Sequence, residues 1–433
     1  MPSTPSPPLY RVWQVCYNPH SWFQSRGLRL NVPDSISASA AMQDQDSRFA
    51  AAFQTIEQAI ADRAFPAATL AVTRRSDLVA LKAFGQFTFD AESPPVTAAT
   101  LFDIASVTKV AATTAMAMLL YQHGLLDLDA PVGSIVPEFL SPSAVKPDPR
   151  RRAVTIEMLL AHSSGLQAHE KFYLTTSTRE ELLTAVYSAP LTTDPGTRTE
   201  YSDLGFILLG VLLEHLAGEP LDAFCQRKIF GPLGMISTTF NLRSALRQMT
   251  PPTADERPWG TGTLVSEQAV AHPPLSGSPL AARSTFRGRI IQGEVQDENA
   301  SVFGGVAGHA GLFSTAEDLS RFARALLAAT PFRPATIALF TRRKSSPPGT
   351  SRALGWDTPS APSQSGKYFS PLSFGHLGYT GTSLWIDPEC ELSITLLTNR
   401  TWPDCSNSLI RTVRPQLHDR IVEAICTKRP KGK

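Results

Sequence analysis

Two strand–turn–strand patterns near opposite ends of the chain constrain its fold most. The first covers residues 68–74 and 78–84, with a turn at Ser76-Asp77, and the second covers 383–386 and 393–398. Short runs of β-branched and apolar residues separated by turn residues are typical of antiparallel hairpins. Mostly helical patterns lie between the two hairpins, so we expect both hairpins to belong to a single antiparallel sheet.

Helical periodicity precedes, separates and follows these hairpins. Phe49, Phe53, Ile56 and Ile60 recur at helical spacing, which predicts an amphipathic helix over about 46–63. Further helices are predicted over 108–123, 155–161, 205–217, 316–329 and 414–426. The predicted fold is therefore α+β: an antiparallel β-sheet flanked by N- and C-terminal helices, with a mostly helical insertion domain.

The expected domain organisation follows from the same patterns. The Pro- and Ser-rich leader lacks periodicity and is predicted to be disordered or irregular, with Met42 as a candidate true start. Two stretches dense in Pro, Gly and Ser, 251–285 and 345–366, are predicted surface loops. The predicted parts are a leader (1–41), one domain (42–428) with its sheet from about 65–90 and 370–428 and its insertion over about 100–340, and a basic tail (429–433).

Composition excludes several classes of function. The net charge of +2 and the lack of a long basic block predict no nucleic-acid partner. The five scattered cysteines suggest free thiols, with neither a disulfide framework nor a metal site. No apolar run reaches the ~18 residues that span a bilayer, so no transmembrane segment is predicted. No secretory signal is visible, so the expected location is the cytoplasm. The oligomeric state stays open.

The segment Ser106-Val107-Thr108-Lys109 carries the first chemical signal. Ser106 lies near the start of a predicted helix, and Lys109 lies one turn later on the same face. A serine hydroxyl needs a neighbouring base, and a lysine can be that base if burial and the helix N-terminus lower its pKa. The motif alone is weak, because an ordinary helix start with a serine cap looks the same.

Two later segments could complete a site. Tyr201-Ser202-Asp203 precedes an apolar helix, and a phenol beside a lysine can relay protons, although Tyr201 is equally well a core aromatic. Gly375-His376-Leu377-Gly378-Tyr379 precedes a predicted strand, where glycines allow close approach of a substrate. A turn rich in glycine is the alternative. His162 and His309, in Ser/Gly-rich turns, are expected to be structural.

The order and spacing of these segments resemble the signatures of class C β-lactamases, low-molecular-weight DD-peptidases and related esterases: Ser-x-x-Lys, Tyr-x-Asn and Lys-Thr-Gly. The resemblance extends over about Phe65 to Ile425. Further segments that resemble the family are 100–106, 124–132, 159–166 and 304–315. The resemblance implies a serine hydrolase without metal or organic cofactor, acting on a small-molecule or peptidoglycan-derived amide or ester.

The resemblance also assigns roles to individual residues. Ser106 would be acylated, and Lys109 and Tyr201 would share general base and acid duty. The backbone N–H groups of Ser106 and Tyr379 would form the oxyanion hole. Gly378 would leave room for the acyl group. Asp203 and His376 would bind substrate beside them.

Two departures from the family pattern bear on the substrate. Asp203 stands where an amide is usual; an ionised carboxylate cannot donate and would instead pair with Lys109. His376-Leu377-Gly378 replaces Lys-Thr-Gly and weakens recognition of a substrate carboxylate. These departures favour a carboxylic-ester hydrolase over a β-lactamase or DD-peptidase. A peptide-binding or scaffold protein without turnover is the alternative of another class, whereas an α/β-hydrolase is excluded by the missing Gly-x-Ser-x-Gly.

Overall fold

The computed structural model describes residues 42–142, 145–257 and 284–425, which belong to one structural unit, Ser35–Lys433. The predicted leader and basic tail, and most of the predicted loop 251–285, lie outside the described residues. Residues 345–366 form no helix or strand, as expected for the second predicted loop, but the prediction of a surface position is wrong for Ala353, Leu354 and Trp356, which are buried.

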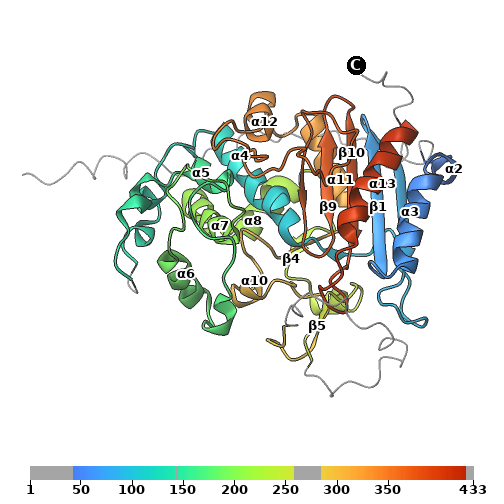
Figure 1. Cartoon of the computed structure of the whole chain (residues 1–433), viewed down its shortest axis with the longest axis horizontal. Helices are drawn as coiled ribbons and strands as arrows, with labels where there is room; N and C mark the ends of the chain where they lie inside the picture. The colour runs from blue at the N-terminus through green and yellow to red at the C-terminus, as the bar shows by residue number, and fades with distance from the viewer. Residues whose placement is uncertain (1–41, 143–144, 258–283, 426–433) are drawn as a thin grey trace, which may run out of the picture. The chain divides into compact units, whose positions relative to one another are not determined.

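A five-stranded antiparallel sheet joins the two ends of the chain (Figure 1). Both predicted hairpins are confirmed, and they meet where β1 pairs with β10, with Leu70 opposite Leu396. The remaining pairs, β1 with β2, β10 with β9 and β9 with β8, are also antiparallel. In the order β2-β1-β10-β9-β8 the strands are β2 (Asp77–Gly85), β1 (Ala67–Arg74), β10 (Leu392–Thr398), β9 (Ser383–Asp387) and β8 (Phe374–Leu377).

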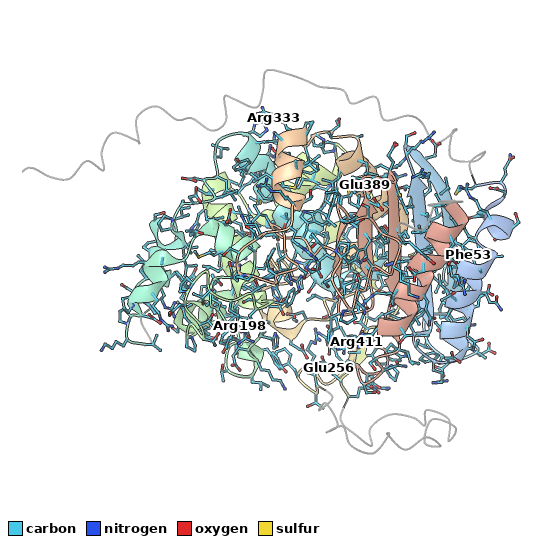
Figure 2. The ribbon with its side chains drawn as sticks, turned by 45° about the horizontal axis from the view of Figure 1, so that its top comes forward. Phe53, Arg198, Glu256, Arg333, Glu389 and Arg411 are labelled. Atoms are coloured by element: carbon cyan, nitrogen blue, oxygen red, sulfur yellow. The ribbon has the colours of Figure 1, made fainter. Side chains whose placement is uncertain are left out.

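Helices cover both faces of this sheet. Helices α3 (Ala50–Ala61) and α13 (Ile410–Ile425) pack side by side over one face, and α11 (Ala316–Leu327) packs on β1 and β10 from the other (Figure 1). Side chains alternate accordingly, because successive residues of a strand point to opposite faces. Ile394 belongs to the core under α3 and α13, whereas Leu397 belongs to the core of the helical insertion. Phe53 of α3, labelled in Figure 2, packs against Phe84 of the sheet, with the ring centroids 5.6 Å apart.

The insertion between β2 and β8 is mostly helical, as predicted. Its centre is α7, whose residues from Leu204 to Leu213 are buried. The α-helices of the insertion are α4 (Ala115–Gln122), α5 (Ile156–Leu160), α6 (Arg179–Ser188), α7 (Asp203–Ala217), α8 (Leu221–Cys225), α9 (Ser244–Arg247), α10 (Glu298–Val302), α11 and α12 (Pro334–Thr341). Its short 3-10 and π turns are η1 (Ala105–Val107), η2 (Lys109–Thr114), η3 (Val132–Ser134), η4 (Pro137–Phe139), η5 (Pro149–Ala153), η6 (Phe172–Leu174) and η7 (Gln226–Phe230).

Both hairpins belong to one sheet, as expected, but two further small sheets within the described residues were not predicted. A three-stranded sheet joins β3 (Phe102–Asp103), β7 (Leu312–Ser314) and β4 (Thr239–Phe240), and β5 (Ala254–Asp255) pairs with β6 (Ile290–Ile291). Strands of two or three residues are too short to show alternation, which is why the sequence did not reveal them.

Two helix boundaries also differ from the prediction. The predicted helix 108–123 is a π-helical turn, η2, that continues into α4, and the 3-10 turn η1 precedes it. Helix α13 begins at Ile410 and contains Pro415, where the prediction placed its start at 414. A proline inside a helix removes one backbone N–H. The Arg411 carbonyl that this N–H would have bound instead accepts from the Gln364 side chain at 3.1 Å.

Two glycines let helix α7 meet the loop that precedes β7. A Cβ at Gly210 would lie 2.9 Å from the Cα of Gly308, and a Cβ at Gly308 would lie 3.0 Å from the Cα of Gly210. The same loop accepts a hydrogen bond from Thr113 Oγ1 to the Gly308 carbonyl at 2.6 Å. The contacts of α7 and of Thr113 in η2 with Gly308 thus fix the backbone next to His309.

Gly210→Ala should destabilise the protein, because the added methyl has to displace the backbone of Gly308. We expect a loss of about 1–3 kcal/mol in the free energy of unfolding, measured by urea denaturation. Gly205→Ala on the same helix is the matched control. Its Cβ would meet nothing closer than 3.6 Å, so it should be neutral or add up to about 1 kcal/mol through helix propensity. Equal stability of the two variants would contradict the close approach.

Candidate active site

Ser106 lies in a 3-10 turn directly after strand β3. Ala105 adopts a left-handed conformation with φ of +46°, and its N–H donates to Asp103 Oδ1 at 2.7 Å. The other oxygen of Asp103 accepts from the Gln296 N–H at 2.6 Å. Burial raises the pKa of Asp103 to about 6. Asp103 therefore holds the strained turn that presents Ser106.

Lys109 is fully buried one turn after Ser106, as the spacing predicted. Its Nζ donates to Ser106 Oγ at 2.9 Å and to Asp203 Oδ1 at 2.7 Å. A third hydrogen bond, of 3.0 Å, goes to the His309 carbonyl. A lysine ammonium has three donors, so all three are used. The amine is thus held in one position against the serine hydroxyl.

Tyr201 approaches Ser106 from a different part of the chain. Its Oη donates to Ser106 Oγ at 2.8 Å, and Lys109 Nζ lies 4.9 Å from the centre of its ring. The ring of His162 packs against Tyr201 at 4.7 Å, and His162 Nδ1 accepts from the Ser202 N–H at 3.0 Å. The structure thus gives Tyr201 a place at the serine, while His162 holds the backbone beside it.

Asp203, the first residue of α7, pairs with Lys109 as the sequence predicted, and this pair sets the charges. Burial alone would raise the pKa of Asp203, but Lys109 and His169 outweigh it and hold that pKa well below its usual range. Burial would likewise lower the pKa of Lys109, but the attraction of Asp203 and Tyr201 raises it. The expectation of a lowered lysine pKa is therefore wrong for the resting site. Burial also raises the pKa of Tyr201.

His376 lies on β8 at the edge of this group. Its Nδ1 donates to the Leu377 carbonyl at 2.8 Å, which leaves Nε2 as an acceptor, and Nε2 is buried without a partner among the described residues. Burial, followed by the repulsion of Lys109 and Arg352, lowers the pKa of His376 to about 3. The imidazole is therefore neutral at pH 7, as expected. The next residue, Leu377, packs against the hydrophobic core between the sheet and helices α3 and α13.

The turn after β8 lies against the strand that leads to Ser106. Thr380 Oγ1 donates to the Asp103 carbonyl at 2.8 Å, and Thr382 Oγ1 donates to the Ile104 carbonyl at 2.9 Å. A Cβ at Gly378 would lie 1.9 Å from Thr382 Oγ1 and 2.5 Å from the Ile104 carbonyl. Contacts within the protein therefore already require a glycine at 378. The family resemblance had explained this glycine by the room that it leaves for an acyl group.

Of the two expected oxyanion donors, Ser106 follows this strand and Tyr379 lies in this turn. Neither the Ser106 N–H nor the Tyr379 N–H finds a protein acceptor within the part of the chain that the structure describes. Such free backbone N–H groups are available to a developing negative charge. The Tyr379 side chain itself is half exposed.

Two side chains next to the site, His169 and Arg352, could not be predicted from the sequence. His169 Nδ1 lies 3.6 Å from Asp203 Oδ2, an interaction that raises the pKa of this partly exposed histidine. The guanidinium of Arg352, in the predicted surface loop 345–366, lies over the Tyr201 ring at 5.3 Å. His309 contributes its carbonyl, while its ring Nε2 donates to Asp297 Oδ1 at 2.9 Å. His169 and Arg352 lie in no recognisable motif, because their contacts join segments distant in sequence, whereas His309 lies in the family-like segment 304–315 and was expected to be structural.

Sequence comparison decides the family. The family described as Beta-lactamase matches residues 52–414. The chain belongs to the β-lactamase family. Its relatives include an N-acetylmuramyl-L-alanine amidase of Bacillus subtilis, 30% identical over 409 residues that cover 89% of this chain and 88% of that protein. A putative D-alanyl-D-alanine carboxypeptidase of Salmonella agona is 29% identical over 371 residues, covering 80% and 81%.

Solved structures show the same β-lactamase-family fold. EstCE1, a hydrolase with promiscuous acyltransferase activity, superposes with a TM-score of 0.66 at 22% identity, covering 87% of this chain and 99% of that one. The octameric penicillin-binding protein homologue from Pyrococcus abyssi gives 0.62 at 21% identity, covering 88% and 78%. This chain is therefore a hydrolase of the β-lactamase and penicillin-binding protein family, with the α+β fold that its sequence predicted.

Further findings complete the description of this β-lactamase-family chain. Cys225, Cys390 and Cys405 form no disulfide, and Cys16 and Cys426 lie outside the described residues. No single helix in the described ranges is long and apolar enough to cross a membrane. Helix α7 and the segment Leu221–Phe230 pass that test only as a bent pair. No group of three or more His, Cys, Asp or Glu side chains that could hold a metal ion occurs within 42–142, 145–257 and 284–425.

The charges of the site predict how Ser106 reactivity depends on pH. Lys109 is protonated and Tyr201 neutral in the resting site, so the form that can accept the serine proton grows as pH rises. We expect labelling of Ser106 by a fluorophosphonate to accelerate between about pH 7 and 9, by roughly tenfold per pH unit below the inflection. Asp203→Asn removes the main attraction that raises the Lys109 pKa and should move the inflection to lower pH. The labelling rate, measured by mass spectrometry across pH, checks this.

The control for this series is Asp194→Asn, which removes a surface carboxylate paired with Arg150. Its labelling profile should match that of the wild type. An inflection that stays in place in Asp203→Asn would show that the carboxylate does not set the lysine pKa.

Proposed function

We propose that this chain hydrolyses an amide or ester through an acyl-enzyme formed on Ser106. The observation that carries the proposal is the convergence of Lys109 Nζ and Tyr201 Oη on Ser106 Oγ, at 2.9 and 2.8 Å. A nucleophilic serine needs a proton acceptor within hydrogen-bond reach, and both partners satisfy that distance. Two otherwise free backbone N–H groups nearby complete what an acyl transfer requires.

The proposed reaction uses these groups in two half-reactions. Ser106 Oγ bonds to the substrate carbonyl carbon while its proton passes to the Lys109–Tyr201 pair, which has first lost one proton. The carbonyl oxygen, now negative, accepts from the N–H groups of Ser106 and Tyr379. Tyr201 returns the proton to the departing alcohol or amine, and the ester on Ser106 remains. A water molecule then takes the place of the serine hydroxyl and releases the acid by the same route.

Asp203 has a definite part in this scheme. Its carboxylate keeps the positive charge on Lys109, and that charge stabilises the Tyr201 phenolate when the phenol gives up its proton. Every step is performed by groups of the chain itself, so the proposal needs neither a metal nor an organic cofactor. The substrate is a small molecule or a fragment derived from peptidoglycan, as the names of the amidase and carboxypeptidase relatives suggest.

A carboxylic-ester hydrolase is the second candidate, and β8 favours it. β-Lactams and D-alanyl peptides carry a carboxylate, whereas β8 offers a neutral His376 and an apolar Leu377 at the positions of the family's lysine and threonine. A simple ester needs neither contact. A protein that only binds or scaffolds is less well supported, because the contacts to Ser106 are those of a working nucleophile.

Ser106→Ala should lower hydrolysis of p-nitrophenyl acetate by about 10⁴-fold or more, because it removes the hydroxyl that would carry the acyl group. Only one hydroxyl is removed, so the melting temperature should change little. The wild type incubated with a fluorophosphonate should gain one adduct on Ser106, seen by intact-protein and peptide mass spectrometry. Turnover within tenfold of the wild type in the variant would end the proposal.

A comparison of substrates separates the two candidates. If the ester-hydrolase candidate holds, kcat/KM for p-nitrophenyl butyrate should exceed that for benzylpenicillin or a D-alanyl-D-alanine peptide by at least about 100-fold. That factor corresponds to losing one or two charge-assisted contacts of about 1.5–3 kcal/mol each. Faster acylation by the penicillin, followed by mass spectrometry, would favour the β-lactamase or DD-peptidase candidate.

A further inference from the structure

Arg414 on helix α13 is a buried cation without a carboxylate partner among the described residues. Only about 5% of its surface is exposed, and burial lowers its pKa to about 9, so it still carries its charge at neutral pH. Its Nη2 donates to the carbonyls of Gly378 and Thr382, at 3.1 and 3.0 Å. Burying a guanidinium that meets only neutral carbonyls is costly. This unfavourable burial suggests that Arg414 has a functional role.

The two carbonyls that Arg414 binds flank Tyr379, the proposed oxyanion donor. A peptide unit is planar and trans, so its C=O and its N–H point in opposite directions. Because Arg414 draws the Gly378 carbonyl toward α13, the Tyr379 N–H of the same peptide unit points away from α13. The Gly381 N–H donates to the same carbonyl at 3.0 Å and supports this orientation.

The opposite side of the turn is the side of the nucleophile. The bonds from Thr380 and Thr382 to the carbonyls of Asp103 and Ile104 hold the turn against the segment that joins β3 to Ser106. Arg400 fixes the next carbonyl, because its Nε donates to the Tyr379 oxygen at 2.7 Å. The carbonyls of Gly378, Tyr379 and Thr382 are thus all engaged by arginines, and the Tyr379 N–H is left free.

We infer that Arg414 is a positioning residue for the oxyanion hole: it orients the Gly378–Tyr379 peptide so that its N–H faces the acyl group on Ser106. The inference rests on the proposed acyl-enzyme function and deepens it. Arg414 touches no reacting atom. It acts through the peptide bond whose carbonyl it holds, and it connects the C-terminal helix to the chemistry in the insertion.

Arg414→Met tests the inference, with Arg411→Met as the matched control. Arg411 is exposed near the start of the same helix (Figure 2) and binds neither carbonyl. With p-nitrophenyl acetate we expect Arg414→Met to lower kcat by about 10- to 100-fold with KM changed less than about threefold, since oxyanion donors act mainly in the transition state. Arg411→Met should match the wild type. Arg414→Lys, which can still donate to one carbonyl, should recover part of the loss.

A thionoester separates positioning of the oxyanion hole from a general loss of structure. Sulfur accepts weaker hydrogen bonds than oxygen, so a correctly placed oxyanion hole favours p-nitrophenyl benzoate over its thionobenzoate. Arg414→Met should reduce this preference, because it damages the reaction of the oxygen ester more. A variant that slows both esters equally, with a lowered melting temperature, would show that Arg414 only stabilises the fold and would overturn the inference.

A measurement without turnover keeps the inference separate from the proposed function. In protein labelled with ¹⁵N-tyrosine, the Tyr379 amide signal, assigned by its absence in Tyr379→Phe, should shift or broaden in Arg414→Met and stay in place in Arg411→Met. An unchanged signal together with wild-type kcat in Arg414→Met overturns the inference while Ser106→Ala remains inactive. Full activity of Ser106→Ala would overturn the proposed function, and the amide signal would then still decide whether Arg414 orients this peptide.

Discussion

The buried ion pair between Lys109 and Asp203 is the interaction on which the rest of the site depends. It joins the turn of helix after Ser106 to the start of α7, two segments that are distant in sequence. A buried charge without a partner is strongly unfavourable, so neither residue can move without the other. The pair thereby fixes the amine beside Ser106 Oγ, and Tyr201, two residues before Asp203, donates to the same oxygen.

The identity of the acidic partner changes the electrostatics of the site. An amide at position 203, as is usual in the family, would leave the lysine pKa to be set mainly by burial, which lowers it. The carboxylate of Asp203 reverses that balance and keeps Lys109 protonated in the resting site. In the proposed mechanism, Tyr201 therefore shares the transfer of the Ser106 proton. The partly exposed His169 beside Asp203 brings a second titratable group to the same carboxylate.

The sheet and the insertion are coupled at the turn after β8. Thr380 and Thr382 bind the strand before Ser106, and Arg414 binds the back of the turn from α13. Ser106, the proposed nucleophile, lies in the insertion, and Tyr379, the proposed second oxyanion donor, lies in the turn after strand β8 of the sheet. Hydrogen bonds between the two parts therefore set the distance between them, and a small shift between such elements is enough to affect acyl transfer.

Local sequence patterns were enough to predict a large part of the fold and the first contact of the site. The hairpins, the amphipathic helices and the family resemblance follow from periodicity and from short motifs, because alternation and helical spacing record which face of an element is buried. Ser106 and Lys109 are one helical turn apart, so their contact could be read from the sequence. The strands β3 and β4 could not be predicted, because two-residue strands carry no pattern. The start of α13 was predicted at 414, whereas the helix begins at Ile410.

Only the tertiary structure decided the charge states and the surrounding contacts. The pKa of Lys109 depends on Asp203, and the neutral state of His376 depends on its burial, so both required knowing which side chains meet. Arg352, His169 and Arg414 reach the site from a loop, a second loop and the last helix, without any motif. Electrostatic effects act over a few ångströms in space and are independent of separation along the chain, which is why the sequence alone could propose Ser106 as the nucleophile while the fold determined its environment.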